Sequence, residues 1–222
     1  MTTITALDLF SAIPERFSPL FTNATAQPWE ALNRLDEFIH STIKPGVHGT
    51  LKGDVYLEGE IEIGEGTIVE HGAVIIGPTI IGRNCQVRAG AYVRGFVATG
   101  DGCCIGHSTE VIRSILFNDV RADHLSYIGD SILGTAVHLG AGAKVANLRF
   151  DKHELTVAGV PTGRQKLGVI LGDRCQLGVN VVVGPGVILK PDTWLAGFNL
   201  TTNGIYDRDD IRRLLAQYQN AP

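Results

Sequence analysis

Aromatic residues are scarce in this sequence. Phe, Trp and Tyr together make up 7% of its 222 residues, whereas glycine occurs 27 times. Many glycines combined with abundant Val, Ile and Leu indicate frequent turns and small inward-facing side chains, which is typical of a repeat protein. The length is sufficient for one large domain or two small ones with a sizeable core.

The sequence also lacks a basic excess, a signal-peptide pattern and a membrane-spanning run. The net charge is −4 and the isoelectric point is about 6.0, so no bulk positive field attracts nucleic acid. The first residues show no basic region followed by a long apolar one, and no apolar stretch approaches the ~20 residues of a membrane helix. We therefore expect a soluble, cytoplasmic protein without nucleic-acid or membrane partners.

Cysteine provides no redox or zinc motif. The four cysteines form no CxxC pair and share no zinc-type spacing with histidine. We interpret them as small apolar fillers in a reducing compartment, and we expect no metal. They are Cys85, Cys103, Cys104 and Cys175.

A period of six residues begins at Leu51. Every sixth residue from there is aliphatic or β-branched, and a small or β-branched residue tends to follow four positions later. This period predicts short strands joined by tight corners, with three hexads closing one triangular coil of about 18 residues and the coils pairing as parallel strands. The repeating positions are Leu51, Leu57, Ile63, Val69, Ile75, Ile81, Val87, Val93, Thr99, Ile105 and Val111.

The hexad pattern resembles the hexapeptide-repeat family. This resemblance implies an all-β fold, a left-handed parallel β-helix, which we place over residues 47–205. The left-handed sense comes from the resemblance alone, since parallel crossovers in general are right-handed.

The two ends of the chain are not repetitive. Residues 1–46 are expected to form a helical cap over the open end of the β-helix, with an amphipathic helix over about 28–42 ended by Lys44-Pro45-Gly46. Residues 206–222 are expected to form a C-terminal helix that begins with acidic residues and lies on the last coil or on a neighbouring subunit.

The period is interrupted twice. Val111 and Leu133 are 22 residues apart, and Val145 and Leu171 are 26 apart, neither of which is a multiple of six. The second interruption contains a polar stretch, about 148–167, which we expect to leave the β-helix as a loop. Loops on rigid scaffolds often carry function.

Candidate chemistry lies between the two interruptions. His124-Leu-Ser-Tyr127 is followed by Gly140-Ala141-Gly142 and by Asn147-Leu-Arg-Phe-Asp151, with Gly163–Gly168 beyond. This combination resembles the C-terminal acetyltransferase domain of bifunctional sugar-1-phosphate nucleotidylyltransferase/acetyltransferases, over about residues 60–205 and without their nucleotidylyltransferase domain. The resemblance implies an acetyl-CoA-dependent N-acyltransferase that acts on an amino sugar, such as a hexosamine phosphate.

An amino sugar is largely protonated at neutral pH, so its attack on a thioester needs a base, and histidine suits that role. We therefore interpret His124 as the catalytic residue; alternatively, it is a corner histidine with a structural role. Backbone N–H groups near Ala141 would stabilise the oxyanion.

The resemblance further implies the residues that bind substrate and cofactor. The substrate set is Arg94 as a phosphate ligand, Tyr127, Asn147 and Lys166; the cofactor set is Ala141, Gly142, Gly178 and Ala196. Arg113 joins the substrate set as a nearby substitute, like Arg121, for a phosphate-binding lysine that the relatives have at the position of Ile112. Ile112, His138 and Leu148 depart from the relatives, which have a lysine, an asparagine and a tyrosine there, so the acceptor stays open. His138 is either a further polar contact to the acceptor or a solvent-facing residue.

Two other functions remain open. One is a non-catalytic partner of a separate sugar nucleotidylyltransferase. The other is a different acyltransferase or a metal-dependent enzyme of the gamma carbonic anhydrase type, for which His107 and His124 have suitable spacing but Gly129 stands where the third histidine belongs. The resemblance implies a homotrimer with active sites between subunits.

Overall fold

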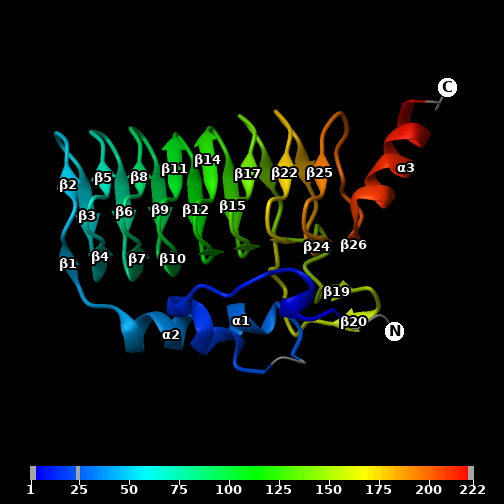
Figure 1. Ribbon diagram of the computed structural model, residues 1–222, viewed down its shortest axis with the longest axis horizontal. Coiled ribbons are helices and arrows are strands. Elements are labelled where there is room, and N and C mark those ends of the chain that lie inside the picture. The colour runs from blue at the N-terminus through cyan, green and yellow to red at the C-terminus, as the bar shows by residue number, and fades with distance from the viewer. Residues whose placement is uncertain (1–3, 24–25, 220–222) are drawn as a thin grey trace.

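Each six-residue unit forms one short strand and one corner of a three-sided parallel β-helix (Figure 1). The computed structural model describes residues 4–23 and 26–219. Within these residues, three parallel sheets run the length of the β-helix, here called sheets A, B and C, with nine, eight and seven strands. The expected all-β, left-handed parallel β-helix is confirmed.

The strands of each sheet follow one another from coil to coil. Sheet A contains β1 (Gly46–Val47), β4 (Ile61–Ile63), β7 (Thr79–Ile81), β10 (Val97–Thr99), β13 (Ile115–Leu116), β16 (Ile132–Leu133), β21 (Val169–Leu171), β24 (Val187–Leu189) and β26 (Gly204–Tyr206). Sheet B contains β2 (Thr50–Leu51), β5 (Ile68–Val69), β8 (Gln86–Val87), β11 (Cys104–His107), β14 (Arg121–His124), β17 (His138–Leu139), β22 (Gln176–Leu177) and β25 (Trp194–Leu195). Sheet C contains β3 (Tyr56–Glu58), β6 (Val74–Ile76), β9 (Tyr92–Arg94), β12 (Glu110–Ile112), β15 (Tyr127–Gly129), β18 (Lys144–Val145) and β23 (Val182–Val183).

At the first interruption of the period, two sides of the triangular coils contain five residues each instead of six. The inward residues Val111 and Leu116, and again Ile128 and Leu133, are five residues apart, so Ile115 pairs with Ile132, 17 residues on. Both shortened sides connect a strand of sheet C to the next strand of sheet A, and the missing residue shortens the corner between them. Each of these corners contains a charged residue with positive φ, Arg113 at 44° and Asp130 at 48°.

The second interruption is a loop between β18 and β21. Leu148 and Lys166 close its base with an antiparallel bridge, and β19 (Thr156–Val157) pairs with β20 (Val160–Pro161) inside it. The loop does not extend freely into solvent. Its apolar residues pack on the outer face of the β-helix; Leu155, Val157 and Leu167 are all buried.

The N-terminal segment lies along the side of the β-helix (Figure 1). It contains the 3₁₀ helices η1 (Ala6–Asp8) and η2 (Glu15–Phe21) and two α-helices, α1 (Glu30–Asn33) and α2 (Leu35–Thr42), in place of the single helix expected over 28–42. It buries the outer face of sheet A in a second apolar core, the flank cluster. Sheet A contributes Ile80, Ala98, Ile115, Ile132, Ile170 and Ile188 to this cluster.

The expected position of this segment, over the open end, is therefore wrong. The outward row of isoleucines on sheet A presents a longer apolar surface than the first coil does, so burying it is the larger hydrophobic gain. At the open end, the inward Leu51 stays 39% exposed.

The C-terminal helix α3 (Arg208–Gln219) covers the other end. Its Ile211 is buried against the inner core, and Leu214 packs beside it. Residues 1–3 and 24–25 of the expected cap and residues 220–222 of the expected C-terminal helix lie outside the described residues.

Candidate functional site

His124 lies at the corner between sheets B and C, at the end of β14. It pairs in register with His107 on the preceding coil. Both imidazoles are exposed, but only that of His107 has partners: its Nδ1 lies 2.7 Å from the Ala89 carbonyl oxygen. Within residues 4–23 and 26–219 the His124 imidazole makes no hydrogen bond or ion pair, so a ligand can reach it.

Ala141 and Gly142 occupy the same corner one coil further on. The Gly142 N–H donates to the His124 carbonyl at 3.0 Å, which places these two coils in direct contact at the candidate base. Gly142 has φ of 75°, and a Cβ there would collide with Asn180 Oδ1. The Ala141 carbonyl accepts from Asn180 N at 2.8 Å. The corner beside His124 therefore has small side chains, as approach of a thioester requires.

Gly178 and Ala196 lie on sheet B next to this corner. Leu139, Leu177 and Leu195 stack in register, so the residues that follow them, Gly140, Gly178 and Ala196, form a strip of small residues. A Cβ at Gly178 would lie 3.0 Å from that of Ala196. Gly178 and Ala196 thus lie in this strip, and Ala141 and Gly142 follow Gly140 at the corner, where the exposed side chain of Val179 stands on the next coil.

Tyr127 and Asn147 converge on the outer face of sheet C. Tyr127 begins β15, between Glu110 and Lys144 of the neighbouring coils. A Cβ built on Gly129 would lie 2.7 Å from both the Tyr127 hydroxyl and the Asn147 Nδ2 atom. Burial raises the pKa of the Tyr127 phenol and nearby carboxylates add to this effect, while a hydrogen bond with Asn147 opposes it.

Arg94 ends β9 on the same face. Its Nη1 atom donates to Glu110 Oε1 at 2.7 Å, and its guanidinium lies over the Tyr92 ring. The hydrogen bond to Glu110 raises the pKa of Arg94. Glu110 lies on the coil between them, in register with both Tyr92 and Tyr127, so Arg94 is two coils from Tyr127.

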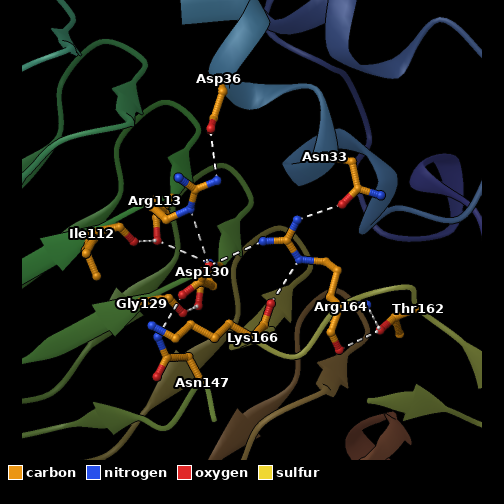
Figure 2. Close-up of polar contacts among 12 residues, drawn as sticks. Asn33, Asp36, Ile112, Arg113, Gly129, Asp130, Asn147, Thr162, Arg164 and Lys166 are labelled. Atoms are coloured by element: carbon orange, nitrogen blue, oxygen red, sulfur yellow. Dashed lines mark hydrogen bonds and ion pairs between the residues drawn. The ribbon is translucent and has the colours of Figure 1, made fainter. Parts of the chain in front are cut away.

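Arg113 and Lys166 lie around Asp130 and Asn147 (Figure 2). Arg113 is not a free cation: its Nη2 donates to Asp36 Oδ1 at 2.9 Å, and its Nε lies 3.7 Å from Asp130 Oδ1. Lys166 is exposed, and Figure 2 shows its side chain beside that of Asn147.

Two charged residues of this site had no assigned role in the sequence prediction. Asp130 is 2% exposed and accepts from Asn147 Nδ2 at 2.7 Å. Arg164 donates to Asp130 Oδ1 at 3.3 Å. Burial lowers the pKa of Arg164, which Asp130 partly offsets. One signal was present: Asp130 interrupts the apolar sequence between inward Ile128 and inward Leu133, where an unpaired charge is costly.

His138 is half-buried on sheet B, between Arg121 and Gln176 of the adjacent coils, and therefore apart from Tyr127 on sheet C. In the described part of the chain, no group of three or more His, Cys, Asp or Glu side chains is arranged to hold a metal ion. The same residues contain no helix long and apolar enough to span a membrane.

Comparison with known proteins identifies relatives of this chain. The profile of the GMPPB C-terminal domain matches residues 75–189, just over half of the chain. The bifunctional protein GlmU of Methanocaldococcus jannaschii is 33% identical across 85% of this chain and 48% of its own length. The bifunctional sugar-1-phosphate nucleotidylyltransferase/acetyltransferase of Sulfurisphaera tokodaii is 32% identical across 72% of this chain and 41% of its own.

This chain thus spans less than half the length of those two relatives. Among solved structures, a hexapeptide transferase family protein from Anaplasma phagocytophilum aligns over 78% of this chain and 93% of its own, with 19% identity and a TM-score of 0.28. The resemblance predicted from the motif of His124, Tyr127 and Asn147 is confirmed by the sequence relatives.

Proposed function

The chain belongs to the family of the GMPPB C-terminal domain, and from this premise we propose that it is a CoA-dependent N-acyltransferase. The proposed acyl donor is acetyl-CoA and the proposed acceptor is an amino sugar, most simply a hexosamine phosphate. The observation that carries the proposal is the corner at which the His124 imidazole, which has no hydrogen-bond partner among the described residues, meets the small residues Ala141 and Gly142. Both relatives named above are bifunctional proteins, and one carries acetyltransferase in its name.

In the proposed reaction, His124 removes a proton from the acceptor's ammonium group or from its attacking nitrogen. The amine lone pair attacks the thioester carbonyl carbon, the new C–N bond forms, and the C–S bond breaks as CoA leaves. Its sulfur takes up a proton and the product is an amide. A general base of this kind accounts for roughly 10²–10⁴-fold in rate.

The small strip along sheet B is the proposed path for the pantetheine chain. Ala141, Gly142, Gly178 and Ala196 present little side-chain bulk, so an extended chain can lie against the backbone. The Ala141 N–H makes no hydrogen bond within the described residues, which makes it the proposed donor to the oxyanion.

Acceptor binding is proposed at the outer face of sheet C. Tyr127 and Asn147 present polar groups within reach of one ligand, and Arg94 and Lys166 provide cations for a phosphate. Arg94 already binds Glu110 at 2.7 Å, so a phosphate has to compete with a carboxylate there. The proposed assembly is a homotrimer, in which a second subunit would complete the site.

The experiment measures free-thiol release from acetyl-CoA with a panel of hexosamines, hexosamine 1-phosphates and hexosamine 6-phosphates. Wild type should release thiol with at least one acceptor. His124→Ala should lose at least a hundredfold in kcat, with its thermal unfolding unchanged. His107→Ala is the matched control, because His107 is exposed and in register one coil away.

Equal turnover by His124→Ala and wild type would refute the role of His124. Absence of turnover by wild type with every acceptor would instead favour a non-catalytic partner of a separate sugar nucleotidylyltransferase.

A further inference from the structure

Asp130 is a buried carboxylate between two arginines. Its side chain is 3% exposed, and its Oδ1 atom lies 3.3 Å from Arg164 Nη2 and 3.7 Å from Arg113 Nε. Asp130 occupies one of the two shortened corners, with a φ of 48°. An ionised carboxylate in such a position is stable only when its partners neutralise it, and the two guanidiniums do so here.

The two arginines also connect Asp130 to the N-terminal helices (Figure 2). Arg164 Nη1 donates to Asn33 Oδ1 at 2.6 Å, and Arg113 Nη2 donates to Asp36 Oδ1 at 2.9 Å. Asn33 ends α1 and Asp36 lies in the first turn of α2. The corner that holds Asp130 is therefore anchored by α1 and α2, which come much earlier in the chain.

The other oxygen of Asp130 faces the proposed acceptor site. Asn147 Nδ2 donates to Asp130 Oδ2 at 2.7 Å. An ionised carboxylate accepts hydrogen bonds and cannot donate them, so this contact fixes which end of the Asn147 amide faces inward. The same amide nitrogen and the Tyr127 hydroxyl oxygen would each lie 2.7 Å from a Cβ on Gly129, and a hydrogen bond from the Asn147 side chain opposes the rise in the pKa of Tyr127.

We propose that Asp130 is a positioning residue that sets the hydrogen-bond polarity of the acceptor site. With the NH₂ group of Asn147 directed at Asp130 and at the Tyr127 oxygen, the Asn147 carbonyl oxygen is left to accept from the ligand. The Tyr127 hydroxyl hydrogen is left to donate. The site thus presents one acceptor and one donor side by side, which matches an amine or ammonium next to a hydroxyl or phosphate oxygen. This inference rests on the proposed function.

The test is Asp130→Asn, which keeps the shape of the side chain but removes its charge and introduces an NH₂ group. The expected result is a KM for the amino-sugar acceptor raised roughly tenfold to a hundredfold, with the KM for acetyl-CoA unchanged. In a double-mutant cycle, Asp130→Asn should add no further loss to Asn147→Ala, because Asp130 acts through Asn147.

Asp173→Asn is the matched control. Asp173 is also buried and also holds the N-terminal segment, by accepting from Ser11 N at 2.7 Å. Its other oxygen accepts from Thr135 N of the β-helix at 2.8 Å, and neither contact reaches Asn147. It should lower stability without changing the acceptor KM. If Asp173→Asn and Asp130→Asn change this KM equally, or if the double variant is additive, the positioning role is wrong.

A second readout does not depend on turnover. In ¹H–¹⁵N spectra, the Asn147 side-chain NH₂ resonances, assigned by their loss in Asn147→Ala, should exchange slowly with solvent in wild type. Exchange should accelerate at least tenfold in Asp130→Asn. Unchanged exchange would overturn the inference, whereas absent turnover by wild type with protected amide resonances would refute only the proposed function.

Discussion

The hydroxyl of Tyr127 and the side-chain nitrogen of Asn147 meet above the Cα atom of Gly129. A Cβ at Gly129 would lie 2.7 Å from each of them, closer than real Cβ contacts occur. The Gly129 backbone is in β15 and has no positive φ, so glycine is required here for space and not for conformation. The two polar groups can approach each other only because this residue has no side chain.

Gly129→Ala should therefore lower kcat/KM for the acceptor by roughly tenfold or more, by separating Tyr127 from Asn147. The fold should persist, because both displaced side chains border solvent. The measurement is steady-state thiol release with the acceptor varied, beside the denaturation midpoint of each variant. The control is Ile112→Ala. Ile112, on the preceding coil, is paired in register with Gly129, so this substitution changes the neighbouring side chain on sheet C without adding volume. Equal kinetics of wild type and Gly129→Ala would contradict the convergence of the two groups.

The six-residue period was sufficient to predict the β-helix. One inward apolar residue in each hexad fixes which face of that strand points into the core. It was not sufficient to resolve the first interruption. A spacing of 22 can be divided among sides in several ways, and only strand register shows that Val111 to Leu116 and Ile128 to Leu133 are the short ones.

The flank cluster had a signal in the sequence that the hexad pattern concealed. Adjacent apolar pairs, such as Ile80-Ile81 and Ile188-Leu189, place one side chain on each face of sheet A. A repeated pair therefore indicates that the outer face is covered. The charge of Asp130 within an apolar stretch was visible in the sequence, but the contacts of its network with Asn33 and Asp36 were not. Those two residues come from about a hundred residues earlier and are brought there only by tertiary packing.

The N-terminal segment should contribute strongly to stability. Phe10 is 1% exposed and packs on Phe117 with ring centroids 4.8 Å apart. Phe10→Ala should lower the free energy of unfolding by about 3–5 kcal/mol, as for other buried aromatic residues. Leu7→Ala is the control, since Leu7 is 67% exposed and should change stability by less than about 0.5 kcal/mol. Urea denaturation measures both; similar values for the two would mean that the segment is not part of the folded core.

The protein thiols should not react in the native state. All four cysteines are free and at most 2% exposed. Burial raises the pKa of Cys104 to about 12, with the Asp123 carboxylate adding to the effect, and burial likewise raises the pKa of Cys175 to about 12. The hydrogen bond with Cys103 lowers the pKa of Cys85, so Cys85 is protected by its burial alone. Because burial excludes the reagent and thiolates are the reactive form, a disulfide reagent at pH 8 should label none of the four within minutes, and all four in denaturant.

This prediction also decides whether CoA release can be followed with the same reagent, since reactive protein thiols would add to the signal. Cys104→Ser, which removes the outward-facing thiol of sheet B, should leave the native background unchanged. Fast native labelling that disappears in Cys104→Ser would show that the Asp123 side of sheet B opens to solvent.

The pH dependence of stability should depend on Asp123. This residue lies on sheet B with its side chain 12% exposed, and its Oδ1 atom is 2.7 Å from Arg121 and 3.4 Å from Arg88. Burial by itself would raise the pKa of Asp123, but the Cys104 thiol and the two guanidiniums outweigh it and hold the pKa below its usual value. A carboxylate with a lowered folded-state pKa contributes stability above its unfolded pKa of about 3.9, and this contribution is lost as the pH falls through the folded value.

Wild type should therefore lose free energy of unfolding between about pH 5 and pH 3, and Asp123→Asn should show a shallower slope there with lower stability at pH 7. Urea denaturation at half-unit pH steps measures this difference. Glu65→Gln is the control: Glu65 is exposed, and no ion pair of its carboxylate occurs in the described ranges, so its slope should follow wild type. If Asp123→Asn keeps the wild-type slope, the arginines do not stabilise the Asp123 carboxylate in solution. In that case the sheet B face beside His124 is held by packing of its strands and not by these ion pairs.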